Sequence, residues 1–429
     1  MLLEHTKEFL ENSSLDDRKK KGQYFTKKSL KDASLKNIII SDGMYILENS
    51  CGTGEFIHSI LEKNPNVDVD AYDIDEALID LVKENYVTVN AYCSDWLLDT
   101  SDKKYDKIIG NPPYFEISKA ECKERGYGEF LKFCKSKPNI YAFFIAKSIQ
   151  HLKEEGELIY VVPTSMNNGY GFSLLRNFII ENCNIKNIIL HSDDDFKDAQ
   201  QNTMTLHLQK LKEGQPNDGK YIYTNKTTTI FSKNTKAIED LFKNKKSLKE
   251  LGFDVYTGNY VWNQNKKFMS AYDHDTLLLW ASNIEKNSLK LNPTTSNGQM
   301  KFGLTIGPIP LDYKKSSKEQ KSQWVSEHSE NRDPIDKKSI IVNRVTGCGT
   351  KAGIRAAIID IDRPYYTENH LNYIIETENS VMTLEELHRK LISPETTKIL
   401  EYISGNTQLS KKELLNLIPI FLDNKEEKC

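Results

Sequence analysis

Long apolar runs and paired cysteines are both missing from this sequence. No stretch approaches the roughly 18 apolar residues that a membrane-spanning helix needs, and residues 1–22 lack the apolar core of a secretory signal. Seven cysteines in 429 residues include no Cys-x-x-Cys pair. These absences favour a protein of the reducing cytoplasm and predict neither a disulfide framework nor a metal centre.

An excess of charge of one sign is missing as well, because the formal net charge is only −3. The charge is nevertheless unevenly distributed. Residues 221–355 hold 22 Lys and Arg against 13 Asp and Glu, and the segments on either side are acidic. A basic segment of this kind suits a phosphate backbone, although a solvated Lys-rich surface has the same composition.

Short apolar runs alternate with segments of helical periodicity between about residues 43 and 210. This alternation predicts an α/β fold with a doubly wound, mostly parallel sheet. The strict alternation of Met204, Leu206 and Leu208 favours an antiparallel edge strand for the last segment. The seven expected strands are 43–49, 67–75, 87–95, 105–111, 157–163, 184–191 and 202–210.

The alternation of apolar runs with helical segments ends at a polar segment that contains Gly and Pro and is typical of a linker. We therefore predict a catalytic domain at 1–212, a linker at 213–220 and a second domain at 221–429. The second domain is expected to be mixed α+β, with short helices between residues 384 and 423.

Ligands bind beyond the carboxyl ends of the strands in such sheets. The first expected strand leads into Glu48–Gly54, whose glycines let the backbone approach a ligand closely. The second ends at Asp73, at the spacing from which a carboxylate reaches ribose hydroxyls. Asp75 competes for this role, and either residue could instead cap the helix that follows.

The third expected strand ends at Asp95-Trp96, where an acidic acceptor stands beside an aromatic face. This pair suits an adenine ring, whose amino hydrogens the carboxylate would accept, although a lone Asp at a strand end is often only a cap. A dinucleotide or an adenosyl group would satisfy all three strand ends.

The fourth expected strand leads into Asn111-Pro112-Pro113-Tyr114, where two prolines fix a stiff turn. The turn presents the Asn111 side-chain oxygen and the Pro112 carbonyl together. Two acceptors aimed at the hydrogens of an aromatic amino group would direct its lone pair at a sulfonium methyl. Tyr114 offers a flat face to a base that has left the duplex. The motif predicts methyl transfer to a planar nitrogen.

Over about residues 20–210 the chain resembles the gamma-class N6-adenine DNA methyltransferases of restriction–modification systems. Gly22–Thr26 looks like their motif X, Glu48–Gly54 like motif I, Asn111–Tyr114 like motif IV and Asn139–Phe144 like motif V. The resemblance implies catalysis by Asn111, Pro112 and Tyr114. It implies S-adenosyl-L-methionine as the cofactor, held by Phe25, Thr26, Glu48, Ser50, Cys51, Gly52, Gly54, Asp73, Ile74, Asp95, Trp96, Asn111 and Phe144.

The resemblance also places Phe196 as a second aromatic residue against the flipped base, for which a buried core aromatic is the alternative. Two departures are visible. Asn49 stands where proline is usual in motif I, and Lys27 stands where proline is frequent after motif X. Neither departure removes a chemical group that the mechanism requires.

In this family the C-terminal domain recognises the target, which implies double-stranded DNA as the partner. Two loop-like clusters carry side chains suited to bases and phosphates, although ordinary solvated loops have the same composition. The predicted contacts are Asn263, Gln264, Lys266, Lys267, Arg344, Lys351 and Arg355. We expect a monomer, and a cognate restriction endonuclease, where one exists, on a separate chain.

Other readings remain open from the sequence. An RNA guanine methyltransferase or a protein amide methyltransferase would use the same chemistry, and a non-catalytic DNA-binding subunit would keep the same fold. Phe25-Thr26 and the long second domain argue against the protein amide reading. Serine is usual in place of Asn111 for cytosine N4 methylation, and cytosine C5 methylation needs a Pro-Cys pair, which the sequence lacks.

Overall fold

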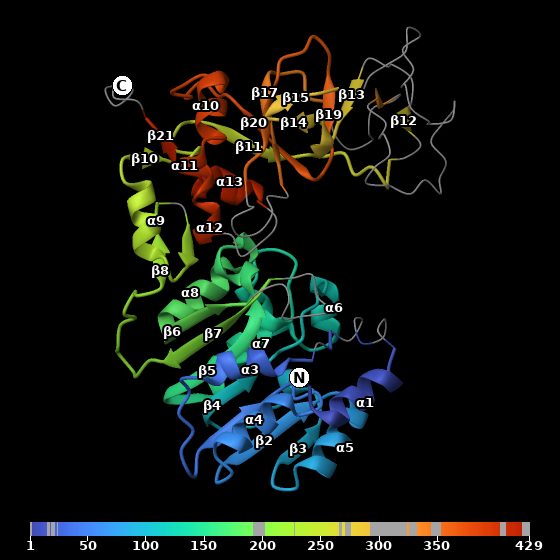
Figure 1. The fold of residues 1–429 in the computed structure, drawn as a ribbon, viewed down its shortest axis with the longest axis vertical. Helices are drawn as coiled ribbons and strands as arrows, with labels where there is room; N and C mark the ends of the chain where they lie inside the picture. The colour runs from blue at the N-terminus through green and yellow to red at the C-terminus, as the bar shows by residue number, and fades with distance from the viewer. Residues whose placement is uncertain are drawn as a thin grey trace. The chain divides into compact units, whose positions relative to one another are not determined.

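The computed structural model describes residues 2–14, 18, 22–23, 25–191, 202–226, 228–265, 268–270, 276–291, 324–325, 333–344, 353–403 and 409–422. The chain forms two compact units, Met1–Thr235 and Lys236–Cys429 (Figure 1). Among the described residues, no helix combines the length and the apolar content that a membrane crossing requires.

A seven-stranded sheet forms the centre of the N-terminal unit, in the order β3-β2-β1-β4-β5-β7-β6. The strands from β3 to β5 are parallel, whereas β7 is antiparallel to both of its neighbours. The predicted doubly wound, mostly parallel sheet is therefore confirmed. The strands are β1 (Tyr45–Glu48), β2 (Asp68–Asp73), β3 (Asn90–Cys93), β4 (Tyr105–Gly110), β5 (Leu152–Pro163), β6 (Cys183–Leu190) and β7 (Thr203–Lys210).

The last predicted strand was expected at the edge of the sheet, and this expectation is wrong. β7 is antiparallel as predicted, but it is inserted between β5 and β6, so that β6 is the edge strand. Met204, Leu206 and Leu208 are fully buried, and Thr203 and Thr205 on the opposite face are nearly so. Hydrogen-bonded neighbours on both sides make β7 an internal strand, and the helices on both faces of the sheet bury its side chains.

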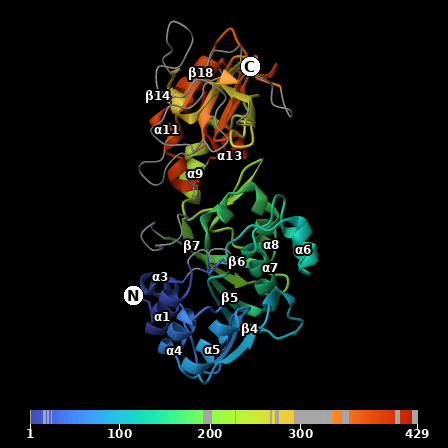
Figure 2. The same cartoon turned by 90° about the vertical axis from the view of Figure 1, so that its right-hand side faces the viewer.

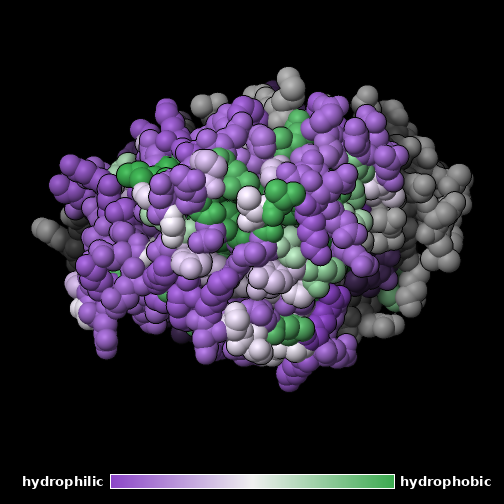
Figure 3. Space-filling model, turned by 90° about the horizontal axis from the view of Figure 1, so that it is seen from below, coloured by the Kyte–Doolittle hydropathy of each residue, from purple (hydrophilic) through white to green (hydrophobic). Residues whose placement is uncertain are grey.

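Helices cover both faces of this sheet (Figure 2). One apolar core joins α3, α4 and α5 to one face of the sheet, and another joins α7 and α8 to the other face. The helices of the unit are α1 (Glu4–Asn12), α3 (Lys28–Leu35), α4 (Glu55–Lys63), α5 (Glu76–Asn85), α6 (Lys119–Glu124), α7 (Tyr141–His151) and α8 (Ser173–Asn182). The face seen in Figure 3 is hydrophilic around a small central apolar area.

The hairpin of β8 (Ile222–Thr224) and β9 (Thr229–Phe231) belongs to the N-terminal unit, although it follows the predicted linker. The buried Arg176 of α8 donates from Nε to the carbonyl oxygen of Thr229 at 2.9 Å. This long-range contact ties the hairpin to α8, and the two compact units divide after Thr235.

Two four-stranded sheets form the larger part of the C-terminal unit, in the orders β11-β20-β17-β18 and β12-β16-β13-β19. Short helices follow them, as expected, so the predicted mixed α+β architecture is confirmed. The strands are β10 (Lys245–Lys246), β11 (Asp254–Thr257), β12 (Met269–Ser270), β13 (Thr276–Leu279), β14 (Ile284–Glu285), β15 (Ser288–Leu289), β16 (Trp324–Val325), β17 (Ser339–Asn343), β18 (Ala356–Ile359), β19 (Tyr365–Thr367), β20 (Leu371–Ile375) and β21 (Ile420–Phe421). The helices are α9 (Thr235–Phe242), α10 (Leu384–Leu391), α11 (Pro394–Thr397), α12 (Leu400–Ile403) and α13 (Lys411–Leu417).

Candidate active site

A pocket opens at the carboxyl ends of β1, β2, β3 and β4, where a doubly wound sheet binds its ligands. The structure brings twelve of the thirteen predicted cofactor residues into its wall, and Gly54 is the exception. The pocket is lined by Gly22, Gln23, Phe25, Thr26, Glu48, Asn49, Ser50, Cys51, Gly52, Thr53, Glu55, Phe56, Asp73, Ile74, Ser94, Asp95, Trp96, Leu97, Asn111, Pro113, Phe115, Arg125, Tyr127, Ile140 and Phe144.

Gly54 lies outside the lining for a structural reason. Its φ of +83° is a left-handed conformation that glycine adopts without strain. A Cβ atom at this position would stand 2.7 Å from the ring of Tyr86. Gly54 therefore allows the loop to enter α4 beneath Tyr86.

The glycine loop is fixed to the end of β2 through Asp73. The Asp73 carboxylate accepts from the Gly52 amide at 2.9 Å and from the Asp75 amide at 3.0 Å. Asp75 instead accepts from Gln23 at 3.2 Å and does not line the pocket. Of the two competing carboxylates, Asp73 is thus the one at the pocket. The neighbouring Ile74 is 66% exposed and offers an apolar wall open to a ligand.

Asn49 takes over the stiffening role that a proline would have in this loop. Its amide nitrogen donates to Ser148 at 3.1 Å, and its amide oxygen accepts from the Tyr160 hydroxyl at 2.6 Å. All three side chains are buried, and Ser148 and Tyr160 belong to α7 and β5. Side-chain hydrogen bonds therefore tie the start of the glycine loop to two other elements.

The Asp95 side chain caps the 3-10 turn Trp96–Leu98 and also faces the pocket. Its carboxylate accepts from the Leu97 amide at 3.0 Å and from the Tyr127 hydroxyl at 2.5 Å. Trp96 is 2% exposed and packs against Phe144, with ring centroids 5.9 Å apart. These two aromatic side chains form a flat apolar end of the pocket beside a carboxylate.

Carboxylate side chains from Glu48, Glu55 and Asp73 line another part of the pocket. Burial raises the pKa of Glu48 well above its usual value, and the nearby Asp73 and Glu55 add to the effect. Burial likewise raises the pKa of Asp73. A buried cluster of acidic groups favours a cationic ligand, which would restore their ionised forms. A ligand with cationic, ribose and amino-purine parts fits this set of side chains from Glu48 to Asp95.

The Asn-Pro-Pro-Tyr turn lies against this pocket. Asn111 donates from Nδ2 to the Thr26 hydroxyl at 3.1 Å, and its Oδ1 accepts from the Tyr114 hydroxyl. Ser50 donates from its hydroxyl to the Asn111 carbonyl oxygen at 3.3 Å, which joins the glycine loop to the turn. The amide of Asn111 is thereby held in one orientation.

Tyr114, the predicted stacking residue, does not line this pocket. Tyr114 is 8% exposed, and its single hydroxyl hydrogen is shared between Asn111 Oδ1 and the Val161 carbonyl oxygen, which lies 2.6 Å from the hydroxyl oxygen. Pro112 does not line the pocket either. Phe196, the second predicted aromatic residue, lies outside the described residues.

Motif X packs against both the Asn-Pro-Pro-Tyr turn and the glycine loop. A Cβ atom at Gly22 would stand 2.9 Å from the ring of Phe115, so this glycine lets motif X approach the catalytic turn. The Phe25 ring lies over Gly52 and packs against Phe9 of α1, with ring centroids 5.7 Å apart. The rings of Phe25 and Phe9 thus join α1 to the glycine loop.

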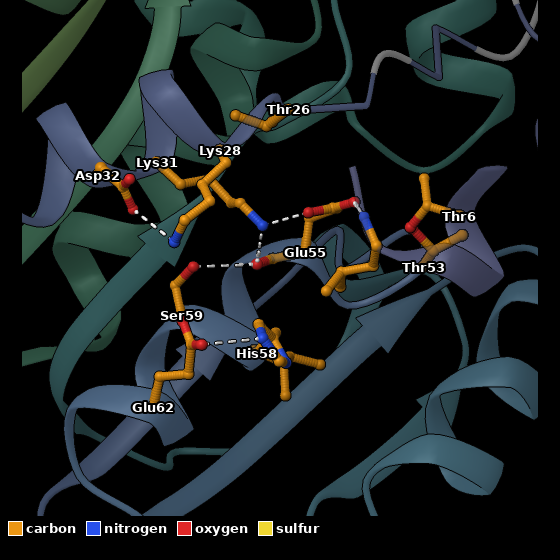
Figure 4. A network of polar contacts seen from close by, with 12 residues as sticks. Thr6, Thr26, Lys28, Lys31, Asp32, Thr53, Glu55, His58, Ser59 and Glu62 are labelled. Atoms are coloured by element: carbon orange, nitrogen blue, oxygen red, sulfur yellow. Dashed lines mark hydrogen bonds and ion pairs between the residues drawn. The ribbon is translucent and has the colours of Figure 1, made fainter. Parts of the chain in front are cut away.

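A buried ion pair anchors the same loop (Figure 4). Lys31 of α3 pairs with the Glu55 carboxylate, and their side chains are 3% and 6% exposed. Lys31 also donates to the Glu55 carbonyl oxygen at 2.9 Å. Glu55 further accepts from the Leu3 amide at 2.9 Å. The hydroxyl groups of Thr6 and Thr53 are hydrogen-bonded to each other, with their oxygens 2.8 Å apart. Both α1 and α3 are therefore fixed to the start of α4.

The predicted DNA contacts fall into three groups. Asn263, Gln264 and Arg355 are exposed. Arg344 is partly buried and donates from Nη1 to the Asn369 carbonyl oxygen at 2.7 Å, so it has a structural role. The remaining predictions lie outside the described residues: Lys266, Lys267 and Lys351.

Arg125 and Tyr127 line the pocket but were not singled out from the sequence. They follow α6, which begins at a capping signature, Ser118-Lys119-Ala120-Glu121, in which the Ser118 hydroxyl accepts from the Glu121 amide at 3.1 Å. The helix ends at Glu124, and Gly126, two residues further on, has a φ of +82°. Those start and stop signals could have revealed a turn after the catalytic motif, but not its position against the pocket.

Part of the N-terminal unit is similar to a class of known proteins. Residues 23–196 match the Eco57I restriction-modification methylase family model. The resemblance to restriction–modification methyltransferases predicted from the motifs is thereby confirmed. S-adenosylmethionine is the cofactor of this class of methyltransferase, and the side chains around the pocket fit it.

Two curated relatives are methylases. The chain is 28% identical over 213 residues to the type II methyltransferase M.AccI of Acinetobacter calcoaceticus, covering 45% of this chain and 37% of that protein. It is 28% identical over 224 residues to the modification methylase CviBIII of Paramecium bursaria Chlorella virus NC1A, covering 51% and 56%. The chain thus spans between about one third and just over half of the length of these relatives.

A solved structure with a similar arrangement is the type I restriction-modification system methyltransferase subunit from Streptococcus thermophilus. The identity is 16% and the TM-score is 0.38, with 51% of this chain and 52% of that chain covered.

Proposed function

We propose that this protein is a site-specific DNA methyltransferase that transfers the methyl group of S-adenosylmethionine to N6 of a flipped-out adenine. It would serve as the modification enzyme of a restriction–modification system or act as an orphan methyltransferase. The observation that carries the proposal is the fixed side-chain amide of Asn111, held by Thr26 and Tyr114 beside a pocket lined with carboxylates.

The cofactor would supply an electrophilic sulfonium methyl group. Glu48 and Asp73 provide negative charge at one end of the pocket, and Asp95, Trp96 and Phe144 provide an acceptor and an apolar wall at the other. Asn111 Oδ1 and the Pro112 carbonyl oxygen would accept the two hydrogens of the target amine. Preorganised acceptors of this kind direct the amine lone pair without a covalent enzyme intermediate.

Tyr114 would have to change partners during this reaction. Its hydroxyl donates to Asn111 Oδ1, the atom that the target amine needs. Arrival of the amine would release this hydrogen bond, and the Tyr114 ring could then stack on the base. The hydrogen bond therefore keeps the Asn111 amide oriented until the base arrives.

The C-terminal unit is the proposed recognition domain for double-stranded DNA. Exposed Asn263, Gln264 and Arg355 and the basic composition of residues 221–355 support this assignment. We further propose that the protein acts in the cytoplasm as a monomer, with any cognate endonuclease on a separate chain.

Transfer of labelled methyl groups tests the proposed chemistry. The full-length chain is incubated with methyl-labelled S-adenosylmethionine and unmethylated DNA, and the DNA is digested to nucleosides. We expect the label in N6-methyl-2′-deoxyadenosine from the DNA. Label in N4-methylcytosine would contradict the target base, and label only in RNA or protein supplied in parallel would contradict the substrate.

A further inference from the structure

The wall of the pocket beside Asp95 is built by a segment that none of the methyltransferase motifs includes. α6 and the 3-10 helix Gly128–Phe133 flank a short turn from which Arg125 and Tyr127 reach the pocket. Gly126 makes this turn possible, because it has a φ of +82° and its Cβ would stand 3.1 Å from Leu98.

Tyr127 is firmly held in this wall. It is 5% exposed, and its amide donates to the Cys122 carbonyl oxygen at 2.7 Å. Its ring packs edge-on against Phe143, with ring centroids 6.2 Å apart and an interplanar angle of 63°. The Tyr127 hydroxyl group is thus placed by backbone and ring contacts that do not depend on a ligand.

The hydroxyl group of Tyr127 fixes the carboxylate of Asp95. It donates to Asp95 Oδ2 at 2.5 Å, while the Leu97 amide donates to Asp95 Oδ1 at 3.0 Å. Burial, reinforced by the hydrogen bond to Asp95, raises the pKa of Tyr127, so the phenol stays protonated and remains a donor. With one lone pair of each oxygen engaged, the remaining lone pairs of Asp95 point in set directions.

We propose that Tyr127 is a positioning residue that sets Asp95 to select a 6-amino purine in the bound cofactor and to reject a 6-oxo purine. The proposal rests on the proposed function, because it assumes that the pocket binds an adenosyl group. An ionised carboxylate only accepts hydrogen bonds, so it attracts an amino group and repels a carbonyl oxygen. Its selectivity depends on its direction, which Tyr127 fixes.

The test compares the affinities of two product analogues for the full-length chain by calorimetry. S-adenosylhomocysteine carries the 6-amino group, and S-inosylhomocysteine carries an oxygen in its place. We expect the wild type to prefer the amino compound, and Tyr127→Phe to reduce this preference about tenfold, as the loss of one hydrogen bond to a charged group predicts. Tyr92→Phe, an exposed tyrosine outside the pocket, should keep the wild-type ratio.

Thermal unfolding of each variant checks that the fold is retained, and phenylalanine preserves the ring packing of Tyr127. A Tyr127→Phe variant that weakens both analogues equally, with an unchanged ratio, would overturn the proposal and leave Tyr127 a structural wall residue. A wild type that binds both analogues equally would also overturn it. A wild type that binds neither would overturn it together with the cofactor assignment, and this result is distinct from the other two.

Discussion

Asn111 has its amide fixed from both ends before any substrate is present. Thr26 accepts from Nδ2 and Tyr114 donates to Oδ1, so the acceptor atom cannot exchange places with the donor atom without breaking two hydrogen bonds. Reorganisation of an acceptor during a reaction adds to its barrier, and a fixed acceptor avoids that cost. In the proposed mechanism, Thr26 of motif X therefore contributes to the orientation of Asn111.

Replacement of Asn111 by alanine should reduce methyl transfer while leaving cofactor affinity nearly unchanged. Loss of one preorganised polar group costs about 10²–10³-fold in rate. The measurement is single-turnover transfer to DNA together with calorimetric titration of the cofactor. Asn85→Ala, which removes an exposed amide on α5, is the matched control. Equal rates for Asn111→Ala and the wild type would contradict the catalytic assignment.

Glu48 makes cofactor affinity depend on pH. Burial raises its pKa above the usual value, so protonated Glu48 must lose its proton to interact with a cationic ligand. Affinity should therefore rise by up to about tenfold per pH unit below the raised pKa and level off above it. Titrations in buffers of different ionisation enthalpy should show proton release. Glu48→Gln should remove this dependence of cofactor affinity on pH. A wild-type affinity that does not change with pH would contradict the role of Glu48.

The positions of the site residues could be predicted from the sequence because the carboxyl ends of parallel strands meet at one edge of a sheet. Asp73, Asp95 and Asn111 were found in this way. Their hydrogen-bond partners could not be found, because Tyr127 and Thr26 come from segments 32 and 85 residues away. No local pattern encodes such contacts.

At the scale of elements, the glycine loop is held by helices that precede it in the chain. Lys31 of α3 pairs with Glu55 at the start of α4, and Leu3 beside α1 donates to the same carboxylate. Glu55 lines the cofactor pocket, so this buried pair links the packing of the N-terminal helices to the shape of the site.

Lys31→Met should destabilise the protein strongly, because it leaves the Glu55 carboxylate buried without its cationic partner. Breaking a buried pair from one side costs about 3–5 kcal/mol. Lys28→Met is the matched control on the same helix, since its pair with Asp32 is 3.4 Å long and both side chains are 56% exposed. An exposed pair of this kind contributes about 0.3–0.5 kcal/mol.

Urea unfolding of both variants gives the comparison, and cofactor titration shows whether the pocket is altered. The double change Lys31→Met with Glu55→Gln should recover a large part of the lost stability, because it removes the unpaired charge. Similar losses for Lys31→Met and Lys28→Met would mean that the buried pair has no special role.

Element types were more predictable than their placement. Periodicity located all seven strands of the N-terminal sheet, but the order of strands depends on non-local pairing. The insertion of β7 between β5 and β6, and the attachment of the β8–β9 hairpin through Arg176, therefore went unpredicted. The alternation of apolar and polar residues in β7 indicated that Met204, Leu206 and Leu208 are buried, but it did not indicate which strands lie beside β7.

At the scale of the whole molecule, we expect the N-terminal unit to bind the cofactor and transfer the methyl group, and the C-terminal unit to recognise DNA. The N-terminal unit holds every residue of the pocket, and the basic composition lies almost entirely in the C-terminal half. We infer that affinity for phosphates comes mainly from residues 221–355. This division would let the target sequence change without altering the chemistry.

The double change Lys266→Ala/Lys267→Ala should weaken DNA binding and lower its dependence on salt. Each phosphate contact contributes about 0.9 to the slope of log K against log salt, so the slope should fall by about 1–2. Binding is measured over a series of salt concentrations. Lys36→Ala/Lys63→Ala removes two exposed lysines of the N-terminal unit and is the matched control. An unchanged slope would exclude Lys266 and Lys267 from the interface.

The most direct test of the central claim is to express the full chain in a host that lacks DNA methylation and to map modified bases across its genome. The account predicts N6-methyladenine at one recurring sequence with the wild type and at background level with Asn111→Ala. No N6-methyladenine above background with the wild type, or identical maps for the two proteins, would contradict it.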